Sequence, residues 1–255
     1  MHTISIFGLK EGTGRSTLTM ALAAALVAKN YRVLIVDATD GTTTRRDVSL
    51  EGWVAHQHRD GTAEDALEVC VPDSDDSLEN LLTGAAWRGI GITLVDTGAR
   101  LNAYHTALAQ ICDLVLVPFI SEVDARAVTG QLTPAGDTAP LFGVEVCVSR
   151  NMLWRSRALE SFGGVTLQTT LSRSDVFARM PGMGRLDRRV AALDDPEAED
   201  APGLFEATDM RHAWTEAQEL ATEVVWMLKG YMLEYVCFRD APTDPQASGS
   251  GRSST

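Results

Sequence analysis

A glycine-rich loop near the start of the chain joins a strand-like segment to an apolar helical segment. The stretch reads IFGLKEGTGRSTLTMALAAAL over residues 6–26, with Gly12 and Gly14 in the loop and Ser16 at the start of the helix. Glycine permits the backbone turns that point successive N–H groups at one spot, and the helix N-terminus adds partial positive charge there. The stretch therefore predicts an anion-binding turn between a strand and a helix.

The loop departs from the usual phosphate-loop pattern, G-x-x-x-x-G-K-[ST], at two positions. Leu9 stands at the first glycine and Arg15 stands at the lysine. Ser16 keeps the hydroxyl that ligates Mg²⁺ in such loops, and Thr17 can cap the helix or contact phosphate. A glycine-rich turn that binds no ligand remains the alternative interpretation.

Short apolar runs alternate with amphipathic stretches, and this alternation predicts the fold class. Strands are expected at 3–7, 32–38, 91–97, 114–119 and 143–149, and helices at 16–30, 121–134, 151–162 and about 209–238. Apolar strands separated by helices are typical of a parallel sheet that is covered on both faces. We expect a doubly wound α/β fold in one domain over residues 1–240, followed by a disordered tail over residues 241–255, which are rich in Pro, Gly and Ser.

Charge is distributed unevenly in a chain whose net charge is −13. Residues 60–80 and 192–209 are acidic and are interpreted as solvated loops or helix faces. Arginines outnumber acidic residues between positions 150 and 189, which makes a local basic surface possible on an acidic protein. The net charge by itself argues against nucleic-acid binding, and the arginines that could form this local surface are Arg155, Arg157, Arg173, Arg179, Arg185, Arg188 and Arg189. The alternative is that these arginines form an ordinary solvated face in a sequence that uses arginine for most of its basic residues.

The cysteines and the N-terminal residues indicate the cellular compartment in which the protein is expected. Cys70, Cys112, Cys147 and Cys237 form no C-x-x-C pair, which argues against a zinc site and against a disulfide framework. No targeting segment is visible, and the apolar run after the loop is too short to span a bilayer. We expect a cytoplasmic protein, with association with the nucleoid or a cell pole as an option.

Two aspartates end expected strands. Asp37 closes RVLIVDATD and Asp96 closes the strand in ITLVDTGAR. Ligands bind at the carboxyl ends of strands in open α/β sheets, so we expect both residues near the loop. Ser16, at the start of the helix after the loop, is expected at the same edge of the sheet. A helix cap or a loop acid is the alternative role for Asp37.

The stretch KEGTGRST resembles the deviant Walker A motif, K-G-G-x-G-K-[ST]-T, of the ParA/MinD family of dimerising ATPases. The stretches RVLIVDATD, ITLVDTGAR and LVLVPFISEVD resemble the strand-end motifs of the same family. The region from VEVCVSRNMLWRSRALESF to TTLSRSDVFARMPGMGRL looks most like the VirC-type branch, whose members promote DNA transfer by conjugation-related machinery. The likeness covers roughly residues 1–190.

The resemblance implies a P-loop NTPase fold that binds ATP or ADP with Mg²⁺. It gives Lys10 the role of reaching across a dimer to the partner's phosphates, Asp37 that of orienting the attacking water, and Asp96 that of holding Mg²⁺. Lys10, Asp37 and Arg15 are thereby the candidate catalytic residues. The candidate metal-binding residues that the resemblance implies are Ser16, Asp37 and Asp96. The nucleotide-binding residues that it implies are Lys10, Gly12, Thr13, Gly14, Arg15, Ser16, Thr17, Arg150 and Asn151, with the last two near the base. The implied partners are a second copy in the ATP state, nonspecific DNA, and a partition or relaxosome-type protein. Because ParA-type dimers bind DNA through basic surface residues, the seven arginines named above from Arg155 to Arg189 are the candidate DNA-binding residues.

Three departures from the family pattern leave alternatives open. The guanidinium of Arg15 is larger than the ammonium it replaces, Glu11 brings negative charge to the loop, and Thr39 stands in for a second aspartate. We therefore expect weak ATPase activity. One alternative is a pseudo-ATPase scaffold on DNA or on a protein, and another is a switch that positions a protein cargo.

The expected C-terminal helix has a broad apolar surface and an acidic polar face. Glu216, Glu219, Glu223 and Glu234 lie on that face and oppose binding to anionic lipid. We expect the helix to pack on the domain or against a partner, without forming a stable membrane anchor.

Overall fold

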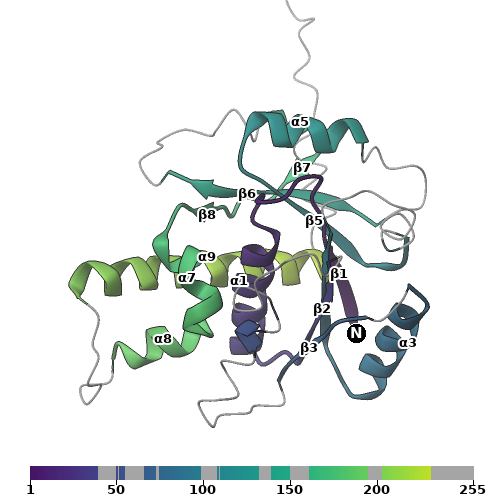
Figure 1. Cartoon of the computed structure of the whole chain (residues 1–255), viewed down its shortest axis with the longest axis horizontal. Helices are drawn as coiled ribbons and strands as arrows, with labels where there is room; N and C mark the ends of the chain where they lie inside the picture. The colour runs from purple at the N-terminus through teal and green to yellow at the C-terminus, as the bar shows by residue number, and fades with distance from the viewer. Residues whose placement is uncertain are drawn as a thin grey trace, which may run out of the picture.

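The fold is given by a computed structural model of the chain (Figure 1), which describes residues 1–39, 50, 52–54, 66–72, 75–98, 108, 110–131, 139–149, 161–194 and 203–230. The strands are β1 (His2–Ile6), β2 (Val33–Ala38), β3 (Leu67–Cys70), β4 (Ile92–Thr97), β5 (Leu114–Phe119), β6 (Leu141–Val148), β7 (Val165–Thr166) and β8 (Leu171–Ser172). The helices are α1 (Arg15–Ala28), α3 (Asp75–Trp87), α5 (Glu122–Gln131), α7 (Asp175–Met183), α8 (Leu186–Ala192) and α9 (Leu204–Leu228).

The strands form one parallel sheet in the order β3-β2-β4-β1-β5-β6-β7, with β8 paired to β6. Strand β1 lies between β4 and β5, and the chain runs from β1 to β2 on the β4 side of the sheet and later crosses from β4 to β5 on the other side of β1. Ligand sites of open α/β sheets lie at such a switch point, outside the carboxyl ends of the strands. The topology therefore places the loop after β1 at the position where a ligand is expected.

Helices cover both faces of the sheet (Figure 1). Along β2, Val33 and Ile35 pack into the core beneath α1 and α9, whereas Leu34 and Val36 pack toward α3 on the opposite face. This alternation follows from the two-residue period of a strand. The predicted doubly wound α/β fold is confirmed.

The structure corrects several boundaries. Helix α9 begins at Leu204, before the expected start at 209, and ends at Leu228, where Gly230 turns the chain with a φ of 77°. The sequence prediction also missed α3, α7 and α8 and the short strands β3, β7 and β8. Most of the expected helix at 151–162, the rest of the expected C-terminal helix and the expected tail lie outside the described residues.

Gly143 of β6 lies beneath two stacked phenylalanine rings. The ring centroids of Phe119 and Phe162 are 5.3 Å apart. A Cβ at position 143 would lie 2.8 Å from Cε1 of each ring, closer than packed carbon atoms approach. The two rings therefore depend on glycine at this position.

Replacing Gly143 by alanine is expected to lower the free energy of unfolding by about 1–3 kcal/mol, the usual cost of overpacking a core. Urea unfolding monitored by circular dichroism measures this change. Gly182→Ala is the matched control, because a Cβ there has no atom within 4 Å, and it should be neutral or slightly stabilising. Equal unfolding midpoints for the wild type and Gly143→Ala would refute this account of the packing.

Carboxylates of α9 hold the segment that contains β8. Glu223 accepts hydrogen bonds from the backbone N–H groups of Gln168 (2.8 Å) and Thr169 (2.9 Å). Glu216 accepts from the backbone N–H of Ser172 at 2.9 Å and from its hydroxyl at 3.0 Å. Two carboxylates of the acidic face thus fasten α9 to the segment that contains β8. In the described part of the chain, no helix combines the length and the apolar character needed to cross a membrane.

Glu223→Gln is expected to lower the free energy of unfolding by about 1–3 kcal/mol, because the new amide group turns a donor toward one of the two N–H groups. Glu219→Gln, on the exposed side of the same helix, should change it by less than about 0.5 kcal/mol. Urea titrations of the two variants make the comparison, and equal losses would contradict a specific role for Glu223.

Candidate functional site

The loop between β1 and α1 has the backbone of an anion-binding turn. Gly12 and Gly14 have φ angles of 76° and 84°, in the left-handed region that glycine adopts without strain. Gly14 caps α1, whose first turn contains no acidic residue. The hydroxyl of Thr13 donates to the backbone oxygen of Lys10 at 3.1 Å and holds the loop together. The loop therefore presents N–H groups and a helix N-terminus at one place.

Ser16 and Asp96 meet beside this loop. The Ser16 hydroxyl donates to Oδ2 of Asp96 at 2.7 Å, and the Asp96 side chain is fully buried. The pKa of Asp96 is raised to about 7, chiefly because the carboxyl group is buried. The charge of Asp37 also raises this pKa, whereas the hydrogen bond from Ser16 and the charge of Arg15 lower it. Oδ1 of Asp96 is buried without a hydrogen-bond partner among the described residues.

This pair fits a magnesium ion. A buried carboxylate oxygen that lacks a partner, next to a serine hydroxyl, is the hard oxygen donor set that Mg²⁺ prefers. No cluster of three or more His, Cys, Asp and Glu side chains suited to a metal occurs in the described residues. Ser16 and Asp96 would supply two oxygen ligands to a bound Mg²⁺, an ion that usually keeps several water ligands.

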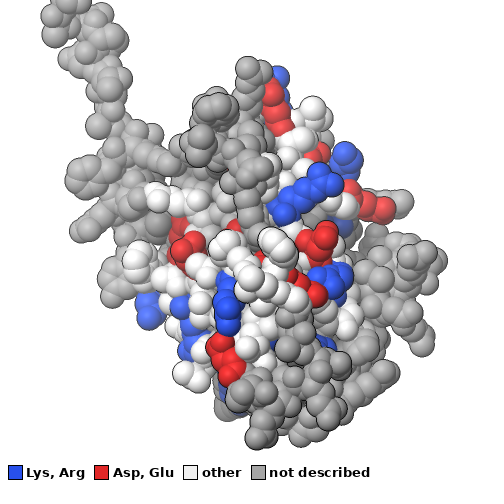
Figure 2. Space-filling model, turned by 90° about the vertical axis from the view of Figure 1, so that its left-hand side faces the viewer, with Lys and Arg blue, Asp and Glu red and all other residues white. Residues whose placement is uncertain are grey.

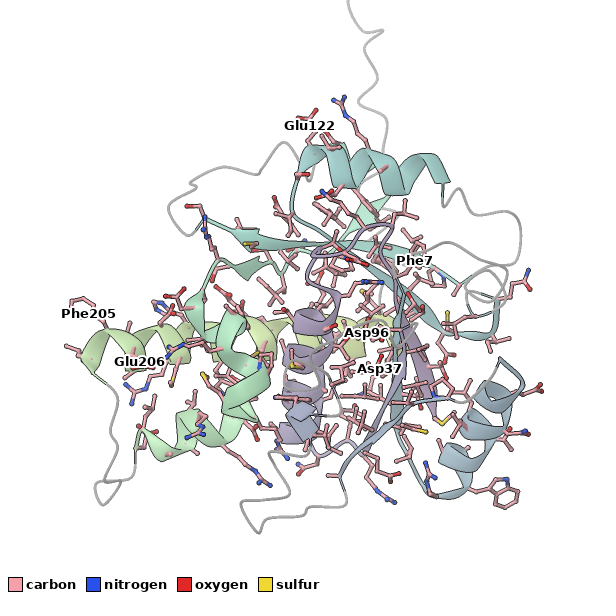
Figure 3. The ribbon with its side chains drawn as sticks, in the orientation of Figure 1. Phe7, Asp37, Asp96, Glu122, Phe205 and Glu206 are labelled. Carbon is pink, nitrogen blue, oxygen red and sulfur yellow. The ribbon has the colours of Figure 1, made fainter. Side chains whose placement is uncertain are left out.

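Asp37 lies next to Asp96 at the carboxyl ends of β2 and β4, opposite it in the strand register (Figure 3). Its Oδ1 accepts hydrogen bonds from the backbone N–H of Thr39 at 3.2 Å and from the Thr39 hydroxyl at 2.5 Å. Thr39, which replaces the second aspartate of the motif, thus fixes the orientation of Asp37. The carboxylate is partly exposed and stays accessible to water.

Arg15 does not extend freely into solvent. Its Nη1 donates to the backbone oxygen of Thr97 at the end of β4, and the Thr97 hydroxyl donates to the backbone oxygen of Ile6 at 3.0 Å. The first residue of α1 is therefore connected to the strand that carries Asp96. Sequence reasoning missed this contact, because only the sheet order places the end of β4 beside the loop.

Lys10 lies on the rim of the loop, with 74% of its side chain exposed. Its Nζ is 3.7 Å from Oδ1 of Asp124, a side chain that is only 11% exposed. Ser121 donates its hydroxyl to the other oxygen of Asp124 at 2.8 Å and accepts from the Asp124 backbone N–H at 3.2 Å. Asp124 lies in the helix that was expected at 121–134, and its ion pair with Lys10 is a contact that the sequence did not reveal.

The predicted DNA-binding arginines separate into different groups. Arg155 and Arg157, as well as Arg150 and Asn151 of the predicted base site, lie outside the described residues. Arg173 directly after β8, Arg179 on α7, and Arg188 and Arg189 on α8 are at least partly exposed. Arg179 pairs with Glu206 at 2.9 Å. The side of the molecule with α7 and α8 shows basic and acidic side chains intermixed, with no continuous basic stripe (Figure 2).

Arg185 is a correction to that prediction. Its side chain is 5% exposed and pairs with Asp187, to which its Nε donates at 3.0 Å. A phosphate backbone cannot reach a guanidinium that is buried in this way. Arg185 therefore stabilises the start of α8 and is removed from the set of candidate DNA contacts.

Known proteins resemble the chain in sequence and in structure. The model of the VirC1 protein family matches residues 1–128. The VirC1 protein of Rhizobium rhizogenes is 25% identical over 187 residues, which cover 71% of this chain and 74% of that protein.

Solved structures of two protein classes share the fold. The MinC:MinD cell division complex of Aquifex aeolicus matches with a TM-score of 0.60 and 15% identity, covering 88% of this chain and 97% of that one. The pNOB8 ParA bound to nonspecific DNA matches with a TM-score of 0.57 and 14% identity, covering 90% and 99%. MinD complexed with Mg-ADP from Pyrococcus horikoshii OT3 matches with a TM-score of 0.56 and 16% identity, covering 86% and 97%. The chain belongs to the VirC1 protein family and has the fold of the MinD and ParA proteins.

Proposed function

We propose that this chain is a ParA-like switch that binds ATP with Mg²⁺, dimerises in that state, and acts in DNA partition or in conjugative DNA transfer. The observation that carries the proposal is Lys10, an exposed cation on the rim of the loop whose ion-pair partner among the described residues is Asp124 of its own chain. Membership of the VirC1 family and the fold shared with a Mg-ADP-bound MinD and a DNA-bound ParA support it.

Different residues around the loop would bind the phosphates, the Mg²⁺ ion and the base of the nucleotide. N–H groups from Gly12 to Thr17 would bind the phosphates, and Ser16 and Asp96 would hold Mg²⁺, which neutralises phosphate charge. Arg150 and Asn151 would lie near the base. Lys10 and Arg15 are the cations of this set that lie in the loop itself, and its glycines allow the backbone to approach the phosphates.

Asp37 is the group that would orient water for hydrolysis. It is partly exposed, and Thr39 fixes one of its oxygens through two hydrogen bonds. Its neighbour Asp96 is buried and suited to a metal, so the two carboxylates take different roles because their environments differ. Slow hydrolysis fits a loop whose lysine is replaced by Arg15, because phosphoryl transfer depends on accurate positioning.

Lys10 can exchange its partner at little cost. An exposed lysine at 3.7 Å from a carboxylate gains at most about 1 kcal/mol from the pair. A polyphosphate carries more charge than Asp124 and would bind the ammonium more strongly. ATP on one protomer can therefore draw Lys10 from the other, and loss of the terminal phosphate would weaken that contact and release the dimer.

Two kinds of cargo fit such a switch. DNA is favoured by family membership and by the exposed arginines, of which Arg173 makes no ion pair in the described part of the chain. A protein cargo is favoured by the intermixed charges around α7 and α8 and by the pairing of Arg179 with Glu206 (Figure 2). We propose DNA as the first candidate and a protein cargo as the second.

Retention on immobilised DNA separates the two candidates. With Mg-ATP the wild type should be retained at ~50 mM salt and released at ~200 mM, because phosphate contacts weaken steeply with salt. Retention should be weaker with Mg-ADP. Arg173→Ala is expected to reduce retention more than the control Arg179→Ala, whose guanidinium is already paired. Indifference to DNA in every nucleotide state would reject DNA and favour a protein cargo.

A further inference from the structure

Arg15 fills the inside of the loop that it follows. A Cβ placed on Gly8 would lie 3.1 Å from Cδ of Arg15, 3.4 Å from its Cγ and 2.9 Å from Oγ1 of Thr13. Gly8 is buried, and Thr13 is only 4% exposed. The side of the loop that faces Gly8 is therefore packed by the chain's own side chains.

The far end of Arg15 is fixed as well. Its guanidinium donates to the backbone oxygen of Thr97, a residue that is fully buried at the end of β4. Asp96 directly precedes Thr97. The positive charge of Arg15 lowers the pKa of Asp96, although burial raises that pKa by more. Arg15 thus spans from the start of α1, past Gly8 of the loop, to the strand that carries the candidate magnesium ligand.

A lysine at this position would not make the same connection. The guanidinium is planar and carries five N–H donors on a long stem, whereas the ammonium of lysine is a compact and strongly hydrated charge. Arginine can therefore occupy the loop with its stem while its tip bonds a carbonyl beyond it. The departure from the usual loop lysine has a visible structural consequence in this protein.

We propose that Arg15 is a gate inside the phosphate loop, which holds the loop against β4 until a nucleoside triphosphate draws the guanidinium away from Thr97. This inference rests on the proposed nucleotide site and adds a regulatory step to it. Displacement of Arg15 precedes full seating of the phosphates, and the displaced guanidinium then becomes a phosphate ligand. Binding consequently takes place in two steps.

Stopped-flow binding of a fluorescent ATP analogue with Mg²⁺ tests the gate. In the wild type the observed rate should level off at high nucleotide concentration, because opening of the loop becomes limiting. In Arg15→Lys the observed rate should rise linearly, because no conformational step limits association. At a nucleotide concentration where the wild-type rate has levelled off, the Arg15→Lys rate should be at least about tenfold faster. Arg32→Lys is the matched control, because Arg32 also donates its Nη1 to a backbone oxygen, that of Arg88, away from the loop.

Hydrogen exchange of residues 9–14 without added nucleotide tests the gate independently of nucleotide binding. Arg15→Lys and Arg15→Gln should exchange these amides at least about tenfold faster than the wild type, since each loses the contact that closes the loop. Using both variants keeps the test valid if one of them misfolds. Arg32→Lys should leave this exchange unchanged.

The outcomes separate the gate from the proposed function. A linear rate in the wild type together with unchanged loop exchange in both variants would overturn the gate and leave nucleotide binding intact. If neither the wild type nor the variants bind nucleotide, the proposed function fails, and the exchange measurement alone decides whether Arg15 closes the loop. Binding by Arg15→Lys alone would support a gate that stays closed in the wild type.

Discussion

Asp96→Asn is expected to stabilise the protein without added nucleotide, although it removes a candidate functional residue. Burial raises the pKa of Asp96 from 3.8 to about 7, so unfolding allows the carboxyl group to ionise more easily. Folding therefore loses stability as the pH rises from about 4 to 7, by roughly 4 kcal/mol for a shift of this size. Asparagine keeps an oxygen for Ser16 and has no charge to bury, so its stability does not carry this pH dependence.

Urea unfolding at pH 5 and pH 8 measures the effect. The advantage of Asp96→Asn over the wild type should grow by about 3 kcal/mol between these two values, because most of the ionisation of Asp96 takes place there. Gly182→Ala is the control, since it removes no titratable group and a Cβ there has no atom within 4 Å, so its difference from the wild type should be the same at both pH values. An advantage that is the same at both pH values would contradict the assignment of the raised pKa to Asp96.

The same variant should lose the part of nucleotide binding that depends on Mg²⁺. Asp96 supplies the one buried carboxylate oxygen without a partner in the described site, and an amide oxygen is a weaker ligand for a hard cation. Titration of ADP with and without Mg²⁺ makes the comparison. A gain in stability together with a loss of binding is the pattern expected where a site keeps an unfavourable group for its function.

Lys10→Ala is expected to abolish the ATP-dependent dimer and to change Mg-ADP binding by only a few fold. The side chain of Lys10 is 74% exposed, so its removal should not alter the fold of its own domain. The chain contains two other lysines, Lys29 and Lys229. Lys29→Ala is the matched control, because Lys29 is exposed at the end of α1, away from the loop.

Sedimentation of both variants with Mg-ATP and with Mg-ADP measures this difference. The control should behave like the wild type in both nucleotides. Asp124→Asn, which frees Lys10 from its own chain, should keep the dimer. A dimer that persists in Lys10→Ala would show that Lys10 does not complete the partner's site, and the pseudo-ATPase scaffold would then gain support.

Apolar periodicity predicted the central part of the fold because it marks buried strands directly. The strands β1, β2, β4, β5 and β6 and the helix α1 were expected close to where they lie. Strand β3 escaped prediction because its four residues lie in an acidic stretch, and α7 and α8 because Pro181 and glycines interrupt their pattern. Local sequence does not record that β3 gains a parallel partner in β2.

The site was predictable where a residue ends a strand. Asp37 and Asp96 follow apolar runs, and parallel strands bring such ends to one edge of the sheet. Pairings between distant segments were not predictable, because they depend on the sheet order. Asp124 faces Lys10 only because β5 lies next to β1, and Arg185 is buried because Asp187 compensates its charge.

We propose above all that the loop KEGTGRST binds ATP and that two copies of this chain join through it in the ATP state. The most direct test is the solution mass of the wild type by sedimentation without nucleotide, with Mg-ADP and with Mg-ATP. The account predicts a mass near that of one chain, 27.5 kDa, in the first two conditions and about twice that value with Mg-ATP. A mass that is the same in all three conditions would contradict the switch.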